Sequence, residues 1–187
     1  KAKKELQLDA NQPYMLFFGF IRGYKGLDIL LQSMADERVR KLGVKLVVAG
    51  EFYEDAKVYH DIIEKHQLQE AVVLHTDFIP DEKVNLYFSA ADVVVQPYKS
   101  ATQSGVTQIG YHFNKPMIVT KVGGLPEIIP DGKVGYVVEP EPTALASAIH
   151  QFYTENKEVE FSQNAATEKA KYSWEEMVNK IKNFGQS

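Results

Sequence analysis

Short runs of consecutive apolar residues recur along the chain, each bounded by a glycine, a proline or a polar stretch. Uninterrupted apolar runs are typical of strands buried on both faces of a sheet, because a strand with one face in water alternates apolar and polar residues. The runs predict six strands, at Tyr14–Phe18, Lys45–Ala49, Val72–Leu74, Asp92–Gln96, Met117–Thr120 and Gly135–Val138.

Between these runs, apolar residues return every three or four positions, which places them on one face of a helix. Asp81, after Pro80, is a candidate helix N-cap, and Pro142 stands in the first turn of a later helix. The predicted buried faces comprise Leu27, Leu30, Leu31 and Met34; Tyr59, Ile62, Ile63 and His66; Val84, Tyr87, Phe88 and Ala91; Leu145, Ala148, Ile149 and Phe152; and, in a last helix from about Trp174, Met177, Val178 and Ile181.

This alternation of strands and helices predicts an α/β fold, a Rossmann-like doubly wound parallel sheet of about six strands with helices on both faces. In the strand order 3-2-1-4-5-6, the first and fourth strands are neighbours where the winding reverses, and ligands bind beyond their carboxyl ends. The loop Gly19–Gly26 follows the first strand, and the loop with Ser104 and Gly105 follows the fourth. We therefore expect the two loops to meet at one crevice.

Composition narrows the classes of partner. The 187 residues are 44% hydrophobic and 25% charged with a net charge of -4, which predicts an ordinary globular core and argues against a nucleic-acid partner. The absence of cysteine excludes disulfides and thiolate catalysis, and it suits the cytoplasm. No apolar run approaches the roughly 18–20 residues of a membrane span, and no signal peptide is visible.

The stretch from Gln96 to Glu127 contains the main candidate for binding chemistry. A strand, a Ser/Gly loop and a helix follow one another, so the N–H groups of Ser104, Gly105 and Val106 are expected at a helix N-terminus. Such amides and the helix dipole favour an anion. Ser104 is also suited to cap the helix, and both roles can hold at once. We interpret this position as a diphosphate site.

Two cations in the Gly19–Gly26 loop face the same predicted crevice. Arg22 offers a planar fork and Lys25 a point charge, and both recognise phosphate oxygens. Cations at a helix start oppose the helix dipole, so a purely structural interpretation also requires an anion nearby. Lys25 and Arg22 are the residues expected to act in catalysis, and Gly19 is expected among the ligand-binding residues.

Other residues on this edge of the sheet have two interpretations each. Gly50 and Glu51 follow the second strand, and Glu51 is either a solvated loop charge, which its position favours, or a ligand contact. Glu127 either places a negative charge at a helix start or touches the ligand. The five histidines lack metal-binding spacing, so no metal is expected. Hydrolase, Walker A and dinucleotide motifs are absent, and no acid–base pair is evident from spacing.

Several segments together resemble the C-terminal, donor-binding half of a GT-B glycosyltransferase of the GT4 type, over nearly the whole chain. They are FFGFIRGYKGLDILLQSM, KLVVAGE, FIPDEKVNLYFSAADVVVQPY, SGVTQIGYHFNKPMIVTKVGGLPEIIPDGKVGYVV and YSWEEM. The resemblance implies a nucleotide-sugar as donor substrate, no cofactor or metal, and retention of configuration at the transferred hexosyl group.

Residue by residue, the resemblance is uneven at the phosphates. The lysine of the family's K-G motif falls on Lys25. The family's arginine follows the first glycine directly, and that place holds Phe20 here, with Arg22 two residues further on. The resemblance therefore supports Lys25 more strongly than Arg22.

The resemblance also predicts the nucleoside contacts. The family has two glutamates eight residues apart, which fall near Ala101 and Ile109 here, so the contacts to ribose and sugar are expected to differ. The loop at Phe78 and Ile79 is expected to meet the base through backbone atoms.

The resemblance divides the chain into three parts. Residues 1–12 are expected to be a linker from an N-terminal domain that is missing here, residues 13–172 a nucleotide-sugar-binding domain, and residues 173–187 a helix that crosses back to that domain. The missing domain would bind a sugar or lipid-linked acceptor and would carry any membrane association. We expect the chain alone to bind nucleotide weakly and to transfer no sugar. A nucleotide-sugar epimerase and a non-catalytic nucleotide-binding module stay open as alternatives, as do the base, the sugar and the acceptor.

Overall fold

The computed structural model describes residues 1–100 and 104–170 and contains a six-stranded sheet in the order β3-β2-β1-β4-β5-β6. Every neighbouring pair of strands is parallel. The strands are β1 Tyr14–Phe18, β2 Lys45–Ala49, β3 Val72–His75, β4 Val93–Gln96, β5 Met117–Thr120 and β6 Gly135–Val138. The predicted fold class and strand order are confirmed, with β3 one residue longer and β4 one residue shorter than the apolar runs suggested.

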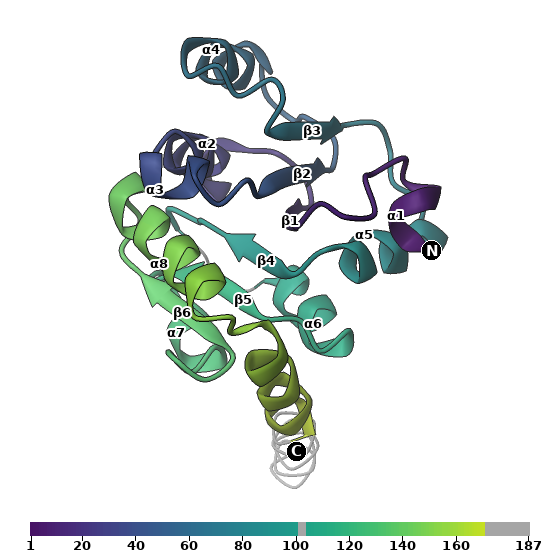
Figure 1. Cartoon of the computed structure of the whole chain (residues 1–187), viewed down its shortest axis with the longest axis vertical. Coiled ribbons are helices and arrows are strands. Elements are labelled where there is room, and N and C mark those ends of the chain that lie inside the picture. The colour runs from purple at the N-terminus through teal and green to yellow at the C-terminus, as the bar shows by residue number, and fades with distance from the viewer. Residues whose placement is uncertain (101–103, 171–187) are drawn as a thin grey trace, which may run out of the picture.

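Helices cover both faces of the sheet (Figure 1). α2, α3 and α8 lie on one side, and α1, α5 and α6 lie on the other. The helices are α1 Ala2–Glu5, α2 Leu27–Met34, α3 Glu37–Arg40, α4 Lys57–Lys65, α5 Val84–Ala90, α6 Gly105–His112, α7 Leu125–Ile128 and α8 Pro142–Thr154, with two 3-10 turns at Gly23–Lys25 and Asp81–Lys83. Residues 158–170 form a further helix.

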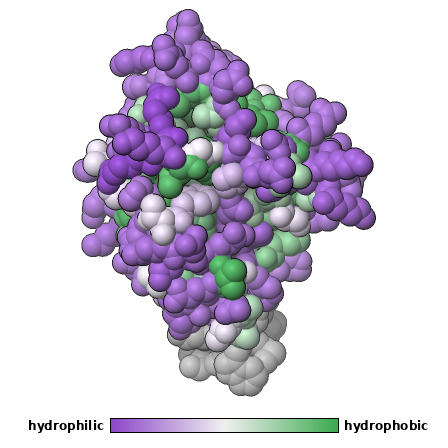
Figure 2. Space-filling view, in the orientation of Figure 1, coloured by the Kyte–Doolittle hydropathy of each residue, from purple (hydrophilic) through white to green (hydrophobic). Residues whose placement is uncertain are grey.

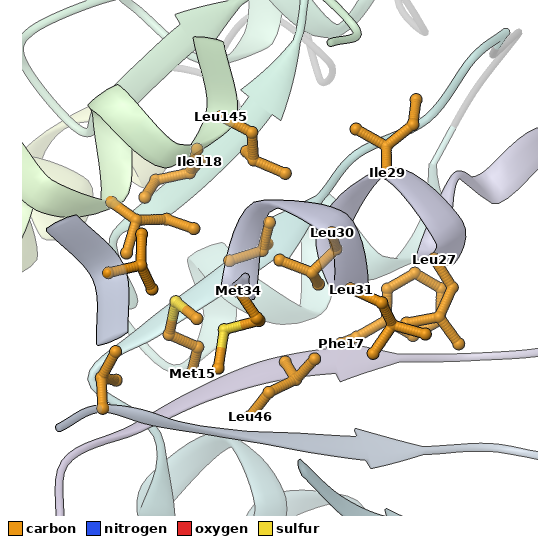
Figure 3. Packing of buried hydrophobic residues seen from close by; sticks show 14 of the residues in the cluster. Met15, Phe17, Leu27, Ile29, Leu30, Leu31, Met34, Leu46, Ile118 and Leu145 are labelled. Carbon is orange, nitrogen blue, oxygen red and sulfur yellow. The ribbon is translucent and has the colours of Figure 1, made fainter. Parts of the chain in front are cut away.

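A separate hydrophobic cluster fills each side of the sheet. On the α2 side, Met15, Phe17 and Leu46 of the strands pack against Leu30 and the rest of the helix, as Figure 3 shows. The intervening strand residues, such as Leu16 and Val47, point to the other side of the sheet and pack against α5, α6 and α7. Both faces of the strands are therefore buried from solvent, which explains why their sequences are continuously apolar.

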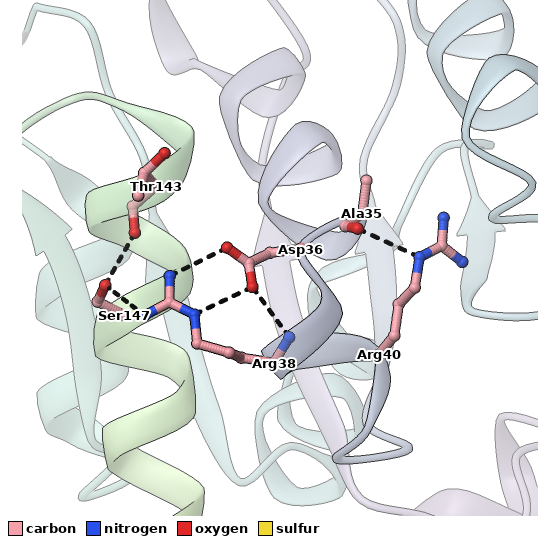
Figure 4. A network of polar contacts seen from close by, with 6 residues as sticks. All are labelled: Ala35, Asp36, Arg38, Arg40, Thr143 and Ser147. Atoms are coloured by element: carbon pink, nitrogen blue, oxygen red, sulfur yellow. Dashed lines mark hydrogen bonds and ion pairs between the residues drawn. The ribbon is translucent and has the colours of Figure 1, made fainter.

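Polar contacts join α3 to α8 across this layer (Figure 4). The Asp36 carboxylate caps α3 by accepting a hydrogen bond from the backbone N–H of Arg38 at 2.9 Å. The Arg38 guanidinium pairs with Asp36 at 3.0 Å and also donates to the Ser147 hydroxyl on α8 at 3.0 Å. The hydrogen bonds from Arg38 lower the pKa of Asp36. The short helix α3 is therefore anchored at its first turn.

Charged groups gather at the amino ends of the central strands. The Asp92 carboxylate, just before β4, accepts hydrogen bonds from the Tyr14 backbone N–H at 3.1 Å and the Tyr153 hydroxyl at 3.0 Å. Burial raises the pKa of Asp92 and of Glu158, and it lowers the pKa of Lys115. This polar cluster lies at the end of the sheet opposite the predicted ligand edge.

Two details of the helices differ from the sequence predictions, and a third lies outside the described residues. The segment 1–12 contains α1, and the leucines that follow it, Leu6 and Leu8, are buried against Tyr14 and neighbouring residues. This segment is thus packed on the domain, whatever precedes it. Asp81 does not cap a helix with its side chain, because it begins a 3-10 turn and α5 starts only at Val84. The helix predicted from Trp174 lies outside the described residues.

The surface that faces the viewer in Figure 2 is mainly hydrophilic, with separated hydrophobic spots. Within residues 1–100 and 104–170, no helix combines the length and apolarity that crossing a membrane requires.

Candidate functional site

A cleft of about 570 Å³ lies at the carboxyl ends of β1 and β4. Its walls come from the loop after β1, the loop after β4 and the first turns of α6. The lining residues are Gly19, Phe20, Tyr24, Lys25, Tyr98, Ser100, Ser104, Gly105, Val106 and Ile109. The two loops that the strand order was expected to bring together are therefore the walls of one cleft.

Close backbone contacts tie these loops together. The backbone N–H of Lys99, after β4, donates to the carbonyl of Tyr24, after β1, at 2.7 Å. The Lys99 ammonium pairs with Asp28 of α2 at 2.8 Å. Gly26 has a left-handed φ of 71°, and a Cβ at this position would overlap the carbonyl oxygen of Pro97. A glycine is thus required where the start of α2 meets the end of β4.

Two more glycines shape the floor of the cleft. Gly19 has a φ of 116°, and a Cβ there would lie 3.2 Å from the Lys25 ammonium nitrogen and 3.7 Å from a methyl carbon of Val106. These distances place the ammonium beside the first turn of α6. A Cβ on Gly50 would overlap the carbonyl oxygen of Gly19, so Gly50 allows the β2 loop to approach the β1 loop. Gly50 itself does not line the cleft.

Lys25 is half-buried in the cleft wall and forms no ion pair with any described residue. Burial, and then the nearby charge of Arg22, lowers the pKa of Lys25. A lowered pKa means that the surroundings disfavour the ammonium relative to the neutral amine. A bound anion would oppose this effect, because it would favour the charged ammonium.

The opposite wall is the N-terminus of α6. Its first amides, on Gly105 and Val106, have no carbonyl partner within the helix. Ser104 caps the helix, since its hydroxyl accepts from the Thr107 N–H at 3.4 Å, as the sequence predicted. A Cβ on Gly105 would meet open space, which leaves this turn accessible.

A buried glutamine holds this helix start in place. Gln96, the last residue of β4, is 1% exposed. Its side-chain carbonyl accepts hydrogen bonds from the hydroxyls of Ser104 at 2.7 Å and Thr107 at 3.0 Å. The N-terminus of α6 is therefore fixed to the carboxyl end of β4 before any ligand arrives. No sequence pattern predicts this role, because a glutamine at a strand end has no distinctive neighbours.

Arg22 points elsewhere. Its guanidinium carbon lies 4.9 Å from the centre of the Tyr53 ring, and Arg22 does not line the cleft. Three of the lining residues that sequence reasoning missed are aromatic: Phe20, Tyr24 and Tyr98. Aromatic residues are so often core residues that their types alone did not point to a site.

A second cleft of about 580 Å³ adjoins the first and shares Gly105 and Ile109 with it. It opens between α5 and α6, and both polar and apolar residues line it. Its remaining lining residues are Asp81, Glu82, Val84, Asn85, Gln108, His112 and Phe113.

The other predicted site residues line neither cleft. Phe78 is 70% exposed and Ile79 half-buried, directly before the turn that borders the second cleft. The backbone carbonyl of Glu51 accepts from Ile21 at 2.9 Å, while Glu127 is exposed on α7. The predicted glutamate position Ala101 lies outside the described residues. Within the described ranges, no group of three or more His, Asp and Glu side chains is arranged to hold a metal ion.

Comparison with known proteins decides the family. Residues 1–172 match the sequence profile described as "Glycosyl transferases group 1". The chain belongs to the group 1 glycosyltransferases. Its resemblance to the GT4 type with the GT-B fold is thereby confirmed. A relative, the D-inositol 3-phosphate glycosyltransferase of Corynebacterium urealyticum, is 26% identical over 96% of this chain and 44% of its own length.

Solved structures agree on the fold of this glycosyltransferase chain. Sucrose-phosphate synthase of Thermosynechococcus elongatus has a TM-score of 0.84 at 23% identity, over 99% of this chain and 47% of the other. HepE of Anabaena, in a complex with UDP and glucose, has a TM-score of 0.80 at 19% identity, over 99% of this chain and 50% of the other. At such identities the likeness establishes the fold alone. The chain spans about half the length of these three proteins, and none of them supports the alternative epimerase.

Proposed function

We propose that this chain is the nucleotide-sugar-binding half of a retaining glycosyltransferase that transfers a hexosyl group to a sugar or lipid-linked acceptor. One observation carries the proposal: the half-buried Lys25 ammonium, which has no carboxylate partner among the described residues, lines the same cleft as the N-terminus of α6. The two are complementary to a diphosphate. The HepE structure with UDP and glucose, on the same fold, supports this choice of ligand.

In this proposal the diphosphate lies between Lys25 and the amides of Gly105 and Val106. Negative charge builds on the diphosphate as the glycosidic bond to the sugar breaks. A fixed ammonium and fixed N–H groups stabilise that charge without having to reorganise. The buried hydrogen bonds from Ser104 to Gln96 keep the amides in position. The described residues of the chain would therefore act on the leaving group, and no metal is proposed.

The nucleoside half of the donor is assigned to the second cleft. That cleft continues from the first at Gly105 and Ile109, and its mixed lining offers polar groups to a ribose and apolar surface to a base. Phe78 and Ile79 directly precede it and remain the proposed backbone contacts to the base. Ile109 places an aliphatic side chain at the boundary between the clefts, where the family has a carboxylate, so the ribose would be held by other groups.

The acceptor is assigned to a part of the protein outside this chain. The chain spans about half the length of its relatives, which supports a second domain that closes over the donor. Residues 1–12 and 173–187 would connect to that domain, and any membrane association would belong to it. A cytoplasmic location agrees with the lack of cysteine and remains a prediction.

Titration calorimetry with UDP, GDP and ADP tests the proposal and selects the base. At least one diphosphate should bind the chain, and Lys25→Ala should weaken it by about 10- to 100-fold, the scale for losing a hydrogen bond to a charged group. Lys41→Ala is the control, because its ammonium pairs with Glu37 at 3.1 Å on the exposed face of α3. A chain that binds none of the three, or a Lys25→Ala variant that binds as well as the wild type, would disprove the proposed site.

A further inference from the structure

Two stacked aromatic rings stand exposed at the rim of the first cleft. Phe20 comes from the loop after β1 and Tyr53 from the loop after β2, and their ring centres are 4.2 Å apart with 24° between the planes. Phe20 is 48% exposed and Tyr53 is 47% exposed. Rings that are half-open to water and gathered beside a cleft are typical of a binding surface.

The backbone holds this aromatic stack in place. Ile21 and Phe52, which neighbour the two rings in the sequence, form an isolated parallel bridge. The Ile21 N–H donates to the Glu51 carbonyl at 2.9 Å, and the Tyr53 N–H donates to the Ile21 carbonyl at 3.0 Å. The Arg22 guanidinium lies over Tyr53, which accounts for its turning away from the cleft. A ligand that docks on these rings would not have to order their backbone first.

The stack lies beside the proposed diphosphate position. Phe20 lines the first cleft, and the Lys25 ammonium is 5.8 Å from the centre of the Phe20 ring. A phosphate oxygen bound to that ammonium at about 2.8 Å would lie no more than about 9 Å from the centre of the Phe20 ring. The nucleoside is assigned to the second cleft, between α5 and α6, so the other group esterified to the diphosphate would face the aromatic stack.

The chemistry of the surface suits a sugar ring. The C–H face of a pyranose is apolar and packs against the electron-rich face of an aromatic ring. Its hydroxyl groups would meet the polar atoms at the rim, which include the hydroxyl of Tyr24, a residue 45% exposed in the cleft wall. A nucleobase also stacks on aromatic rings, but the nucleoside is assigned to the second cleft, whose lining offers it both polar groups and the aromatic ring of Phe113.

We infer that the Phe20–Tyr53 stack binds a pyranose ring, either the hexosyl group of the donor or a sugar of the acceptor. This inference rests on the proposed function, because the diphosphate position orients the ligand. It also suggests a role for Phe20, which occupies the position of the family's arginine. An aromatic ring at this position would contact a sugar, whereas an arginine would contact phosphate.

The experiment compares Phe20→Leu, which removes the aromatic face, with Phe20→Tyr, which retains it. Calorimetry measures the binding of the tightest of UDP, GDP and ADP and of its glucose ester. If the donor's sugar docks here, Phe20→Leu weakens the glucose ester about tenfold, as covering roughly 50 Å² of apolar surface implies, and changes the diphosphate by less than about twofold. Phe20→Tyr then binds like the wild type.

A second arm detects an acceptor sugar. Methyl α-glucoside is added to the chain saturated with the diphosphate, and the NMR ring signals of Tyr53, together with those of Phe20 in the wild type, are followed. Shifts in the wild type and in Phe20→Tyr that disappear in Phe20→Leu support the acceptor as the source. Thermal unfolding of each variant confirms that the fold is intact.

Three outcomes overturn the inference. If Phe20→Leu binds both ligands like the wild type and methyl α-glucoside shifts neither ring, no sugar docks on the stack. If Phe20→Leu weakens the diphosphate as much as its glucose ester, the stack serves the nucleotide instead. If the wild type binds no diphosphate at all, the proposed function itself fails, and that failure is distinct because it appears without any substitution.

Discussion

Lys25 differs from the lysines that form described ion pairs, because its ammonium is half-buried and no carboxylate among the described residues pairs with it. Lys99, on the opposite loop, pairs with Asp28, and Lys133 pairs with Glu168. Burial lowers the pKa of Lys25 because the ammonium loses hydration and gains no carboxylate in return. Its charge is therefore available to a ligand, and its protonation should respond to that ligand.

The first prediction concerns the pH dependence of nucleotide binding. Lys25 binds phosphate only as the ammonium, so affinity should be constant below its folded pKa and should fall as pH rises through that pKa. Because the pKa is lowered, the fall should begin below the ordinary value of 10.5. Calorimetry from pH 6 to pH 10 measures it. Lys25→Arg, which stays charged throughout, should lack this fall. An identical alkaline fall in Lys25→Arg would assign the titration to another group.

The second prediction separates backbone strain from steric overlap at two glycines. Gly26 and Gly43 have similar left-handed φ values, 71° and 68°, but a Cβ on Gly26 would strike the Pro97 carbonyl while a Cβ on Gly43 would meet nothing within 4 Å. Gly43→Ala should cost about 1–2 kcal/mol in the free energy of unfolding, from strain alone. Gly26→Ala should cost clearly more and should weaken nucleotide binding. Denaturant unfolding measures both, and equal losses would contradict the close approach at Pro97.

Individual residues were predicted with mixed success, for a physical reason. Lys25 and Ser104 were placed correctly because backbone topology alone brings their loops together. The direction of Arg22 depends on Tyr53, a residue of a different loop, and no local pattern records such a contact. The roles predicted for the individual ligand-binding residues, Glu51 and Glu127 included, stay predictions.

Among the secondary-structure elements, the strands were the most predictable. A strand that is covered on both faces is mainly a continuous run of apolar residues between turns, and such runs marked all six strands. The short helices α1 and α3 were missed, because four residues are too few to show helical spacing. The cap at Asp81 was wrong since the Asp81–Lys83 turn comes between Pro80 and α5.

The third prediction concerns Asp92, at the amino end of β4. Asp92 has a raised pKa, so its protonated form is favoured in the folded chain. The resulting contribution to the free energy of unfolding is fully present below the ordinary pKa of 3.8 and is lost as pH rises through the folded pKa. Lys3, Lys115, Glu158 and Tyr153 face the same group.

Asp92→Asn tests this sign. Its side-chain oxygen can still accept from Tyr14 and Tyr153, whereas its titration is removed. The stability of the wild type relative to Asp92→Asn should therefore decrease as pH rises from 3 to 7, measured by thermal unfolding across that range. A difference that grows in favour of the wild type with rising pH would show that the Asp92 carboxylate is stabilised instead by the nearby lysines.

For the domain as a whole, the family and the cleft make a fourth prediction. The chain holds a proposed donor site but spans about half the length of its relatives. We expect it to bind a nucleotide-sugar and to release no free nucleotide when a saccharide acceptor is added, because the proposed acceptor site lies outside this chain. Chromatography of the reaction mixture measures this. Turnover by the isolated chain would show that the described half is sufficient.

The hydrogen bond from Lys99 to Tyr24 has a consequence for how the protein is made. During synthesis the β1 loop leaves the ribosome long before β4, and until β4 docks beside β1 the loop has no opposite wall. A nascent chain that ends before Lys99 can therefore present the Lys25 ammonium but no enclosure for a phosphate. Recognition of the ligand should appear abruptly, once α6 has emerged, rather than grow with chain length.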